Sequence, residues 1–177
     1  MIDILISSKT RVKLLLKFFL NADTSAYLRS LESEFGESTN AIRLELNRFE
    51  KAGLLMSVHQ GNRKLFGANR QHPLFADIHN ILLKYTGLDQ IVDRVVSRLG
   101  QLEEVYLVGE LGKGLDSPII DLIFVGDIDK AYLMRLLEKV EVQIKRKIRY
   151  VLFNREEFEA EKNTVLRESN LMLWCKN

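Results

Sequence analysis

The 177-residue sequence has one cysteine, two prolines and three histidines, and it contains no apolar run near 18 residues. A single cysteine, Cys175, excludes an internal disulfide and leaves no cysteine spacing for a structural metal site. We interpret it as an incidental residue near the tail rather than a redox switch. Without a long apolar run or a recognisable secretory signal, we expect no membrane partner and a reduced, cytoplasmic setting.

The sequence also lacks a strong excess of either charge, because the net charge at pH 7 is only +2. The charges are nevertheless unevenly spread. Residues 1–75 contain 11 Lys and Arg against 7 Asp and Glu, whereas residues 76–177 contain 15 against 17. The positive excess therefore lies in the first part of the chain, where attraction to phosphate groups would place it. With 46% hydrophobic residues, the chain can form one large domain or two small ones.

The most informative stretch is residues 25–69, which predicts two helices followed by a hairpin. Apolar residues recur at helical spacing up to Phe35, and Gly36 then ends the first helix. A second helix over 38–52 is predicted from an apolar stripe at i, i+4 and i+7, formed by Ile42, Leu46 and Phe49. The runs "LLMSVH" and "KLFGA" flank the turn "QGNR", which is typical of a β-hairpin over 55–66. Together these elements predict a winged helix-turn-helix.

The outward face of the second helix and the hairpin turn carry groups that suit nucleic acid. A helix fits the major groove and presents Thr, Asn and Arg to base edges, while a neighbouring hairpin can contact phosphates. Double-stranded DNA is therefore the expected partner, although the polar face could also be merely solvated. The predicted DNA-binding residues are Thr39, Asn40, Arg43, Asn47, Arg48, Lys51, Arg63 and Lys64.

Two flanking segments bear on assembly. Residues 7–20, "SSKTRVKLLLKFFL", predict a helix too apolar for a single stripe, so we expect it to be buried on more than one side. It either packs under the helix-turn-helix or also forms a dimer contact. Residues 73–100 predict two helices separated by Gly87, which we interpret as a linker or dimerisation arm; we expect a homodimer. His72 and His79 are seven residues apart, which is not a usual spacing for paired metal ligands.

From residue 101 the pattern changes to short β-rich runs that alternate with helices. "EVYLVG", "IIDLIFVG" and "KIRYVLF" predict strands, and helices are expected over 130–144 and 154–170, before the terminal apolar piece "LMLWC". The predicted fold class is therefore α+β in two domains. We assign 1–72 to the winged helix-turn-helix, 73–100 to the linker helices and 101–177 to a small mixed α/β domain.

These motifs resemble a known family. "LNRFEKAGLL" leading into the hairpin looks like bacterial ArsR-type winged-helix regulators. "GNRKLFGANRQHPLF" through "LLKYTGLDQIV" is similar to a group that joins such a winged helix to a minimal nucleotidyltransferase domain. In that group the transferase motif is Gly-Ser, a short basic glycine-containing loop and then Asp-x-Asp. The resemblance implies a degenerate nucleotide site here, formed by Gly109, Glu110, Lys113 and Asp121.

The departures from that motif bear on the chemistry. Asp121 is retained, but Ile119 stands where the first Asp belongs, and a hydrocarbon side chain cannot coordinate Mg²⁺. Glu110 replaces the Ser that contacts phosphate and would repel a triphosphate. "KIRYVLF" offers Arg149 and no carboxylate, although Asp116 could compensate from the loop. The sequence thus predicts that the chain is not an enzyme and has neither cofactor nor metal.

The predicted function is a DNA-binding transcriptional regulator. Helix 38–52 would read the major groove and wing 55–66 the backbone, with the degenerate domain as a sensing or interaction module for an unidentified small-molecule or protein effector. Two alternatives are an active nucleotidyltransferase with relocated metal ligands and a protein-interaction module. The loop with Gly109, Gly112 and Gly114 is either a retained turn or an anion site. The remaining basic cluster, a solvated turn or a nucleic-acid contact, is Lys145, Arg146, Lys147 and Arg149.

Overall fold

The computed structural model describes residues 6–166 and 169–176, and the chain divides into two compact units, Met1–Tyr85 and Thr86–Asn177. The fold is α+β, with one sheet in each unit. The division falls inside the segment 73–100 that the sequence predicts as a linker. Within the described ranges, no helix is both long enough and apolar enough to cross a bilayer.

The first helix described in unit 1 buries its apolar residues, and the helical turn after it is buried throughout. α2 (Lys9–Leu15) starts after Ser8, whose hydroxyl accepts a hydrogen bond from the Arg11 amide at 3.2 Å. It continues into η1 (Leu16–Leu20), a π-helical turn in which all five side chains are buried. Burial of Lys17 is offset by Glu34, whose carboxylate lies 2.6 Å from the lysine Nζ. The prediction that this segment is buried on more than one side is thus confirmed.

Two helices with a short turn follow. α3 (Leu28–Phe35) ends at Gly36, whose left-handed backbone (φ 61°) suits a residue without a side chain. α4 (Thr39–Lys51) begins after Ser38, whose hydroxyl accepts from the Ala41 amide at 3.2 Å. The predicted apolar stripe of α4 is buried, with Ile42, Leu46 and Phe49 at most 6% exposed. The opposite face of α4 is therefore turned outward.

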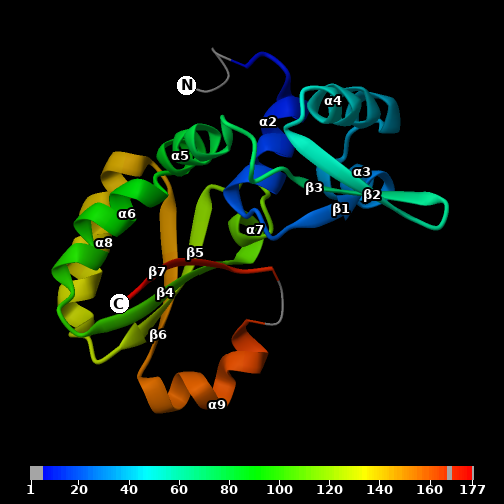
Figure 1. The fold of residues 1–177 in the computed structure, drawn as a ribbon. Coiled ribbons are helices and arrows are strands. Elements are labelled where there is room, and N and C mark those ends of the chain that lie inside the picture. Colours follow the sequence, from blue (N-terminus) through cyan, green and yellow to red (C-terminus); the bar gives the residue numbers. More distant parts are fainter. Residues whose placement is uncertain (1–5, 167–168, 177) are drawn as a thin grey trace. The chain divides into compact units, whose positions relative to one another are not determined.

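A three-stranded antiparallel sheet completes this part of unit 1 (Figure 1). β2 (Leu55–Gln60) and β3 (Arg63–Ala68) form the predicted hairpin, with Gly61 at positive φ in the two-residue turn. β1 (Ser25–Tyr27) pairs with β3 and gives the strand order β1-β3-β2. The sequence did not predict β1, because three residues are too few to show an alternating pattern. α5 (Phe75–Thr86) follows the sheet.

An ion-pair network ties α2 to α4. The buried Glu45 carboxylate accepts from Arg11 Nε at 2.9 Å and from Arg48 Nη1 at 2.8 Å. Burial alone would raise the pKa of Glu45, but the hydrogen bonds and positive charges of Arg11 and Arg48 outweigh it and hold the pKa below its usual value. Arg48, predicted to contact DNA, is thus already paired within the protein.

Unit 2 is built on a four-stranded sheet in the order β6-β5-β4-β7. β4 (Leu102–Val108) is antiparallel to both β5 (Ile119–Gly126) and β7 (Leu171–Cys175). β6 (Lys147–Phe153) is parallel to β5, and α8 (Lys130–Ile144) connects the two. This β-α-β connection is what a parallel pair of strands requires. The predicted boundaries of β5, α8 and β6 are reproduced.

Three predictions in unit 2 need correction, and the terminal apolar piece gains an assignment. The single helix expected from Gly87 to Leu99 is wrong: α6 (Leu88–Arg94) stops, and a short 3₁₀ turn, η2 (Val96–Arg98), follows. Two successive β-branched residues at the break, Val95 and Val96, disfavour a continuous helix. The loop "ELGKGLDSP" contains a one-turn helix, α7 (Gly109–Gly112), and "LMLWC" is a strand. The helix expected over 154–170 is α9 (Arg155–Val165), and residues 167–168 lie outside the described ranges.

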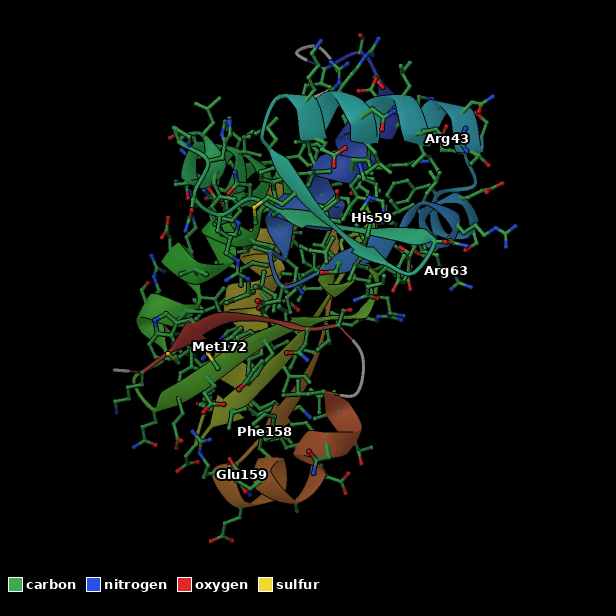
Figure 2. All side chains as sticks on the ribbon, turned by 45° about the vertical axis from the view of Figure 1, so that its right-hand side comes forward. Arg43, His59, Arg63, Phe158, Glu159 and Met172 are labelled. Carbon is green, nitrogen blue, oxygen red and sulfur yellow. The ribbon has the colours of Figure 1, made fainter. Side chains whose placement is uncertain are left out.

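One face of this sheet is covered by α9 through a single large side chain. Phe158 is fully buried and packs with Tyr106, Ile123 and Val125. Its ring centroid lies 5.5 Å from that of Tyr106. Figure 2 shows Phe158 on the side of α9 that faces the sheet. Because Phe158 is the buried residue of α9, it is the main attachment of that helix.

We predict that Phe158→Ala lowers the free energy of unfolding by about 3–5 kcal/mol, since it removes a buried ring and leaves a cavity. Glu159→Ala is the matched control on the same helix. Glu159 is 54% exposed and its ion pairs with Arg155 and Lys162 lie at the surface, so the loss should be at most about 1 kcal/mol. Chemical denaturation of the full chain measures both. Equal losses in the two variants would contradict the assigned role of Phe158.

Candidate functional site

A groove with a volume of about 750 Å³ lies in unit 1 between the start of α3, the outward face of α4 and the hairpin. Its lining combines apolar and basic side chains. None of the described residues that line it is an Asp or a Glu. The lining residues are Tyr27, Leu28, Arg29, Ser30, Arg43, Asn47, Asn62, Arg63, Lys64 and Phe66.

Three arginines of this groove differ from most of the other cations of unit 1. Arg29, Arg43 and Arg63 have no acidic partner within the part of the chain that the structure describes. Arg43 Nη1 lies 3.5 Å from Asn40 Oδ1, and the Arg63 guanidinium lies 6.0 Å from the centroid of the Tyr27 ring. Figure 2 shows Arg43 on α4 and Arg63 at the hairpin turn on the same side of unit 1. The groove is therefore electropositive.

Lys64 lines the same groove but is held by the protein itself. Its Nζ lies 2.7 and 2.8 Å from the two carboxylate oxygens of Glu50, which also accepts from the Ser57 hydroxyl. The same ammonium lies 5.5 Å from the centroid of the Phe66 ring. The charge of Lys64 is thus largely offset, whereas that of Arg63 is not. The sequence could not reveal this, because Glu50 and Lys64 are 14 residues apart.

The structure places the predicted DNA-binding residues in three settings. Arg43, Asn47, Arg63 and Lys64 line the groove, while Asn40 and Lys51 are exposed on α4 outside it and Thr39 is half-buried. Arg48 pairs with Glu45. Their role as DNA contacts stays a prediction. Sequence reasoning missed Arg29, because an arginine on the first turn of α3 shows no pattern until the hairpin is placed opposite it.

In unit 2, the predicted nucleotide site is centred on a glycine turn. Gly109 follows β4 with a left-handed backbone (φ 67°) and begins α7. A Cβ at this position would overlap the carboxylate of Asp121, which lies opposite Val108 in the β4–β5 register. Both the backbone conformation and the close approach therefore require glycine at position 109. The turn and the retained Asp121 are parts of one arrangement.

The Asp121 carboxylate is engaged by an arginine. Arg149, its partner in the β5–β6 register, donates from Nε at 2.6 Å to one oxygen and from Nη2 at 3.0 Å to the other. These hydrogen bonds, and then the negative charge of Asp121, raise the pKa of Arg149. Such a two-point contact is the strong geometry for Arg and carboxylate. From the sequence, Arg149 was noted only because no carboxylate stands on that strand. The structure shows that Arg149 offsets the negative charge of Asp121.

The remaining charges near this turn are also paired. Lys113 Nζ lies 3.6 Å from Glu110, and Arg146 lies 2.8 Å from Asp116. Within the described residues, no group of three or more His, Cys, Asp or Glu side chains could hold a metal ion. The arrangement at Asp121 does not fit a divalent cation while Arg149 binds both carboxylate oxygens. In unit 1, His79 Nδ1 contacts the Phe19 carbonyl at 2.7 Å, and His72 Nδ1 accepts from the Leu74 amide.

No protein-family model and no curated protein sequence matches this chain. Similar solved structures exist. The first, AF1382 from Archaeoglobus fulgidus, has 14% identity and a TM-score of 0.39 over 46% of this chain and 93% of its own. A protein from Sulfolobus solfataricus described as a putative nucleotidyltransferase has 24% identity and a TM-score of 0.35 over 56% and 86%. A complex of the tri-AMPylated Shewanella oneidensis HEPN toxin with MNT antitoxin has 14% identity and a TM-score of 0.38 over 51% and 71%.

One of these structures is described as a putative nucleotidyltransferase, which agrees with that part of the predicted resemblance, whereas the ArsR-type part stays a prediction. They also correct one inference. The sequence predicted that the chain is not an enzyme, because Ile119 replaces the first Asp of the motif. A structure described as a putative nucleotidyltransferase and one of an AMPylated toxin with MNT antitoxin are among the similar ones, so that conclusion is withdrawn. At TM-scores of this size, none of the likenesses assigns a substrate or partner.

We predict that Glu50→Gln destabilises the chain at pH 7 by no more than about 1 kcal/mol, because the Glu50–Lys64 pair is partly exposed. Hydrogen bonds from Lys64 and then Ser57 hold the pKa of Glu50 below its usual 4.5. A carboxyl group with a lower pKa in the folded state stabilises the fold above its unfolded pKa and loses that effect as pH falls through the folded value.

The difference in unfolding free energy between the wild type and Glu50→Gln should therefore shrink below pH ~4.5 and vanish once Glu50 is protonated. Denaturation at several pH values between 3 and 7 measures it. Glu32→Gln is the control, since Glu32 is exposed on α3 and has no cationic partner in the described part of the chain. A difference that stays constant from pH 7 to 3 would contradict the assigned contact.

Proposed function

We propose that unit 1 is a winged helix-turn-helix that binds double-stranded DNA, and that the chain is a transcriptional regulator. The observation that carries the proposal is the groove that three arginines line, with no carboxylate among the described residues of its walls. The arginines come from three elements: α3, α4 and the hairpin. A surface that gathers cations from separate elements and leaves them without acidic partners is suited to a polyanion.

In this proposal α4 enters the major groove. Its apolar stripe is buried, so Asn40, Arg43 and Asn47 are presented on the opposite face. Arg can bind the guanine edge and Asn the adenine edge through two hydrogen bonds each, and those contacts distinguish base pairs. Arg43 and Asn47 are one helical turn apart, which lets them address neighbouring base pairs.

The hairpin and the start of α3 would contact the backbone on either side of that helix. Arg63 at the turn is exposed and would bind phosphate, and Arg29 would do the same from the first turn of α3. The N-terminal end of a helix itself favours phosphate. The resemblance to ArsR-type regulators and a homodimer that reads two half-sites belong to the same proposal.

We expect Arg63→Met to weaken binding on every DNA sequence and to flatten the dependence of log affinity on log salt by about 0.9, the value for one lost phosphate contact. Lys64→Met should change the slope less, because Glu50 already offsets that charge. Fluorescence anisotropy between 50 and 200 mM salt, on a duplex enriched from genomic fragments by the full chain, measures both.

The control for this experiment is Lys84→Met, which removes an exposed cation of α5 that lies outside the groove. It should leave affinity and slope unchanged. If no duplex binds above the non-specific level, DNA recognition is rejected. If the two cations Arg63 and Lys64 give the same slope change, the contact with Glu50 does not withhold Lys64 from phosphate.

A second candidate function is nucleotidyl transfer by unit 2. The observation that favours it is the glycine turn at Gly109 held against Asp121, with the Lys113 ammonium on the same one-turn helix segment. Among the similar structures, the Sulfolobus solfataricus protein is described as a putative nucleotidyltransferase, and the toxin of the Shewanella oneidensis complex is AMPylated. Arg149 would have to release Asp121 before that carboxylate could serve a reaction.

We predict that transfer, tested with labelled nucleoside triphosphates and Mg²⁺ or Mn²⁺, is abolished by Asp121→Asn, since Asp121 is the carboxylate retained at the turn. Labelling of the full chain or of a co-purified protein, followed by gel autoradiography, gives the readout. Asp127→Asn is the control, because Asp127 lies exposed just after β5, at the other end of that strand. Equal labelling in both variants, or none in the wild type, would reject this candidate.

A further inference from the structure

The groove of unit 1 has features that a phosphate backbone alone does not need. Its volume of about 750 Å³ lies in the range of small-molecule sites, and part of its lining is apolar, with Leu28, Tyr27 and Phe66. Contacts with a phosphate backbone need cations at the surface but do not need a hollow. A hollow of this size, lined by aromatic rings and arginines, suits a compact organic anion that has a flat ring.

The residues that line the groove offer separate partners for the phosphate, the ring and the polar edge of such a ligand. Arg29 and Arg43, on α3 and α4, present guanidinium groups that bind phosphate through two hydrogen bonds. The Arg63 guanidinium lies over the Tyr27 ring, and guanidinium planes and aromatic rings are the surfaces on which bases stack. The amides of Asn47 and Asn62 add donors and acceptors for a base edge.

We propose that this groove binds a free nucleoside monophosphate, with the phosphate at Arg29 and Arg43 and the base against Tyr27 and Arg63. We further infer that the nucleotide competes with DNA for these arginines. This part of the inference rests on the proposed function of unit 1, in which the same arginines bind DNA. The bound nucleotide neutralises them and fills the space between α4 and the hairpin. Nucleotide and duplex therefore exclude each other, and the nucleotide acts as an effector that releases DNA.

Isothermal titration calorimetry of the full chain with AMP and CMP, without DNA, tests the site directly. We expect both nucleotides to bind, and adenosine, ribose 5-phosphate and inorganic phosphate to bind at least about tenfold more weakly, since each lacks one half of the ligand. Arg29→Met and Arg43→Met should each weaken AMP binding by about tenfold or more. Lys84→Met, which removes a cation outside the groove, should leave it unchanged.

Three results would overturn the proposal. Inorganic phosphate that binds as tightly as AMP would reduce the site to an anion contact. Lys84→Met and Arg43→Met weakening AMP equally would attribute the effect to overall charge. AMP binding that survives both arginine substitutions but is lost in Lys113→Met would place the nucleotide in unit 2.

The effect on DNA is a separate readout, so failure of the nucleotide site and failure of DNA binding are distinguishable. AMP should multiply the apparent dissociation constant for the enriched duplex by 1 + c/Kd, where c is the concentration of free AMP and Kd is the dissociation constant of AMP measured by calorimetry. Binding of AMP without any binding of DNA would reject the proposed function and keep the nucleotide site. Binding of DNA that saturating AMP does not change would overturn the inference and leave the proposed function in place.

Discussion

Burial of the apolar stripe of α4 fixes the rotation of that helix about its axis. The groove of unit 1 depends on this rotation, because it decides which residues of α4 line the groove. Ile42 and Leu46 are almost completely buried, which fixes Arg43 and Asn47 on the outer side. The ion pairs of Glu45 fasten the same helix to α2. Because the backbone position is determined by packing, the polar residues of the outer face are free to serve recognition.

Charge pairing separates cations that serve the fold from those open to a ligand. In unit 1, Glu45 binds Arg48 and Glu50 binds Lys64, whereas the arginines of the groove face no carboxylate. In unit 2 the group held by an internal partner is an anion, since Arg149 forms an ion pair with the carboxylate of Asp121. A ligand of the Asp121 site must displace Arg149, whereas a ligand at the three groove arginines displaces no carboxylate of the described residues.

Much of the architecture follows from local patterns in the sequence. Helix α4, the hairpin, α8 and β5 were predicted with bounds close to those found, because each has a clear apolar period and a capping or turn residue. The three-residue strand β1 and the break at Val95 were missed, since both are decided by packing. The partners of Lys64 and Asp121 were missed for a related reason: Glu50 and Arg149 are distant in sequence and meet only through folding. Arg29 was missed for the same reason, because only folding brings it to the groove with residues of α4 and the hairpin.

The π-helical turn at η1 affects how well the protein tolerates the deletion of a residue. Its five buried residues occupy a wider turn than an α-helix gives them, so loss of one residue there can be absorbed as the turn tightens to ordinary α geometry. The same loss in α4 would rotate every later side chain by about 100° and turn part of its polar face inward. A one-residue deletion should therefore be tolerated better in η1 than in α4.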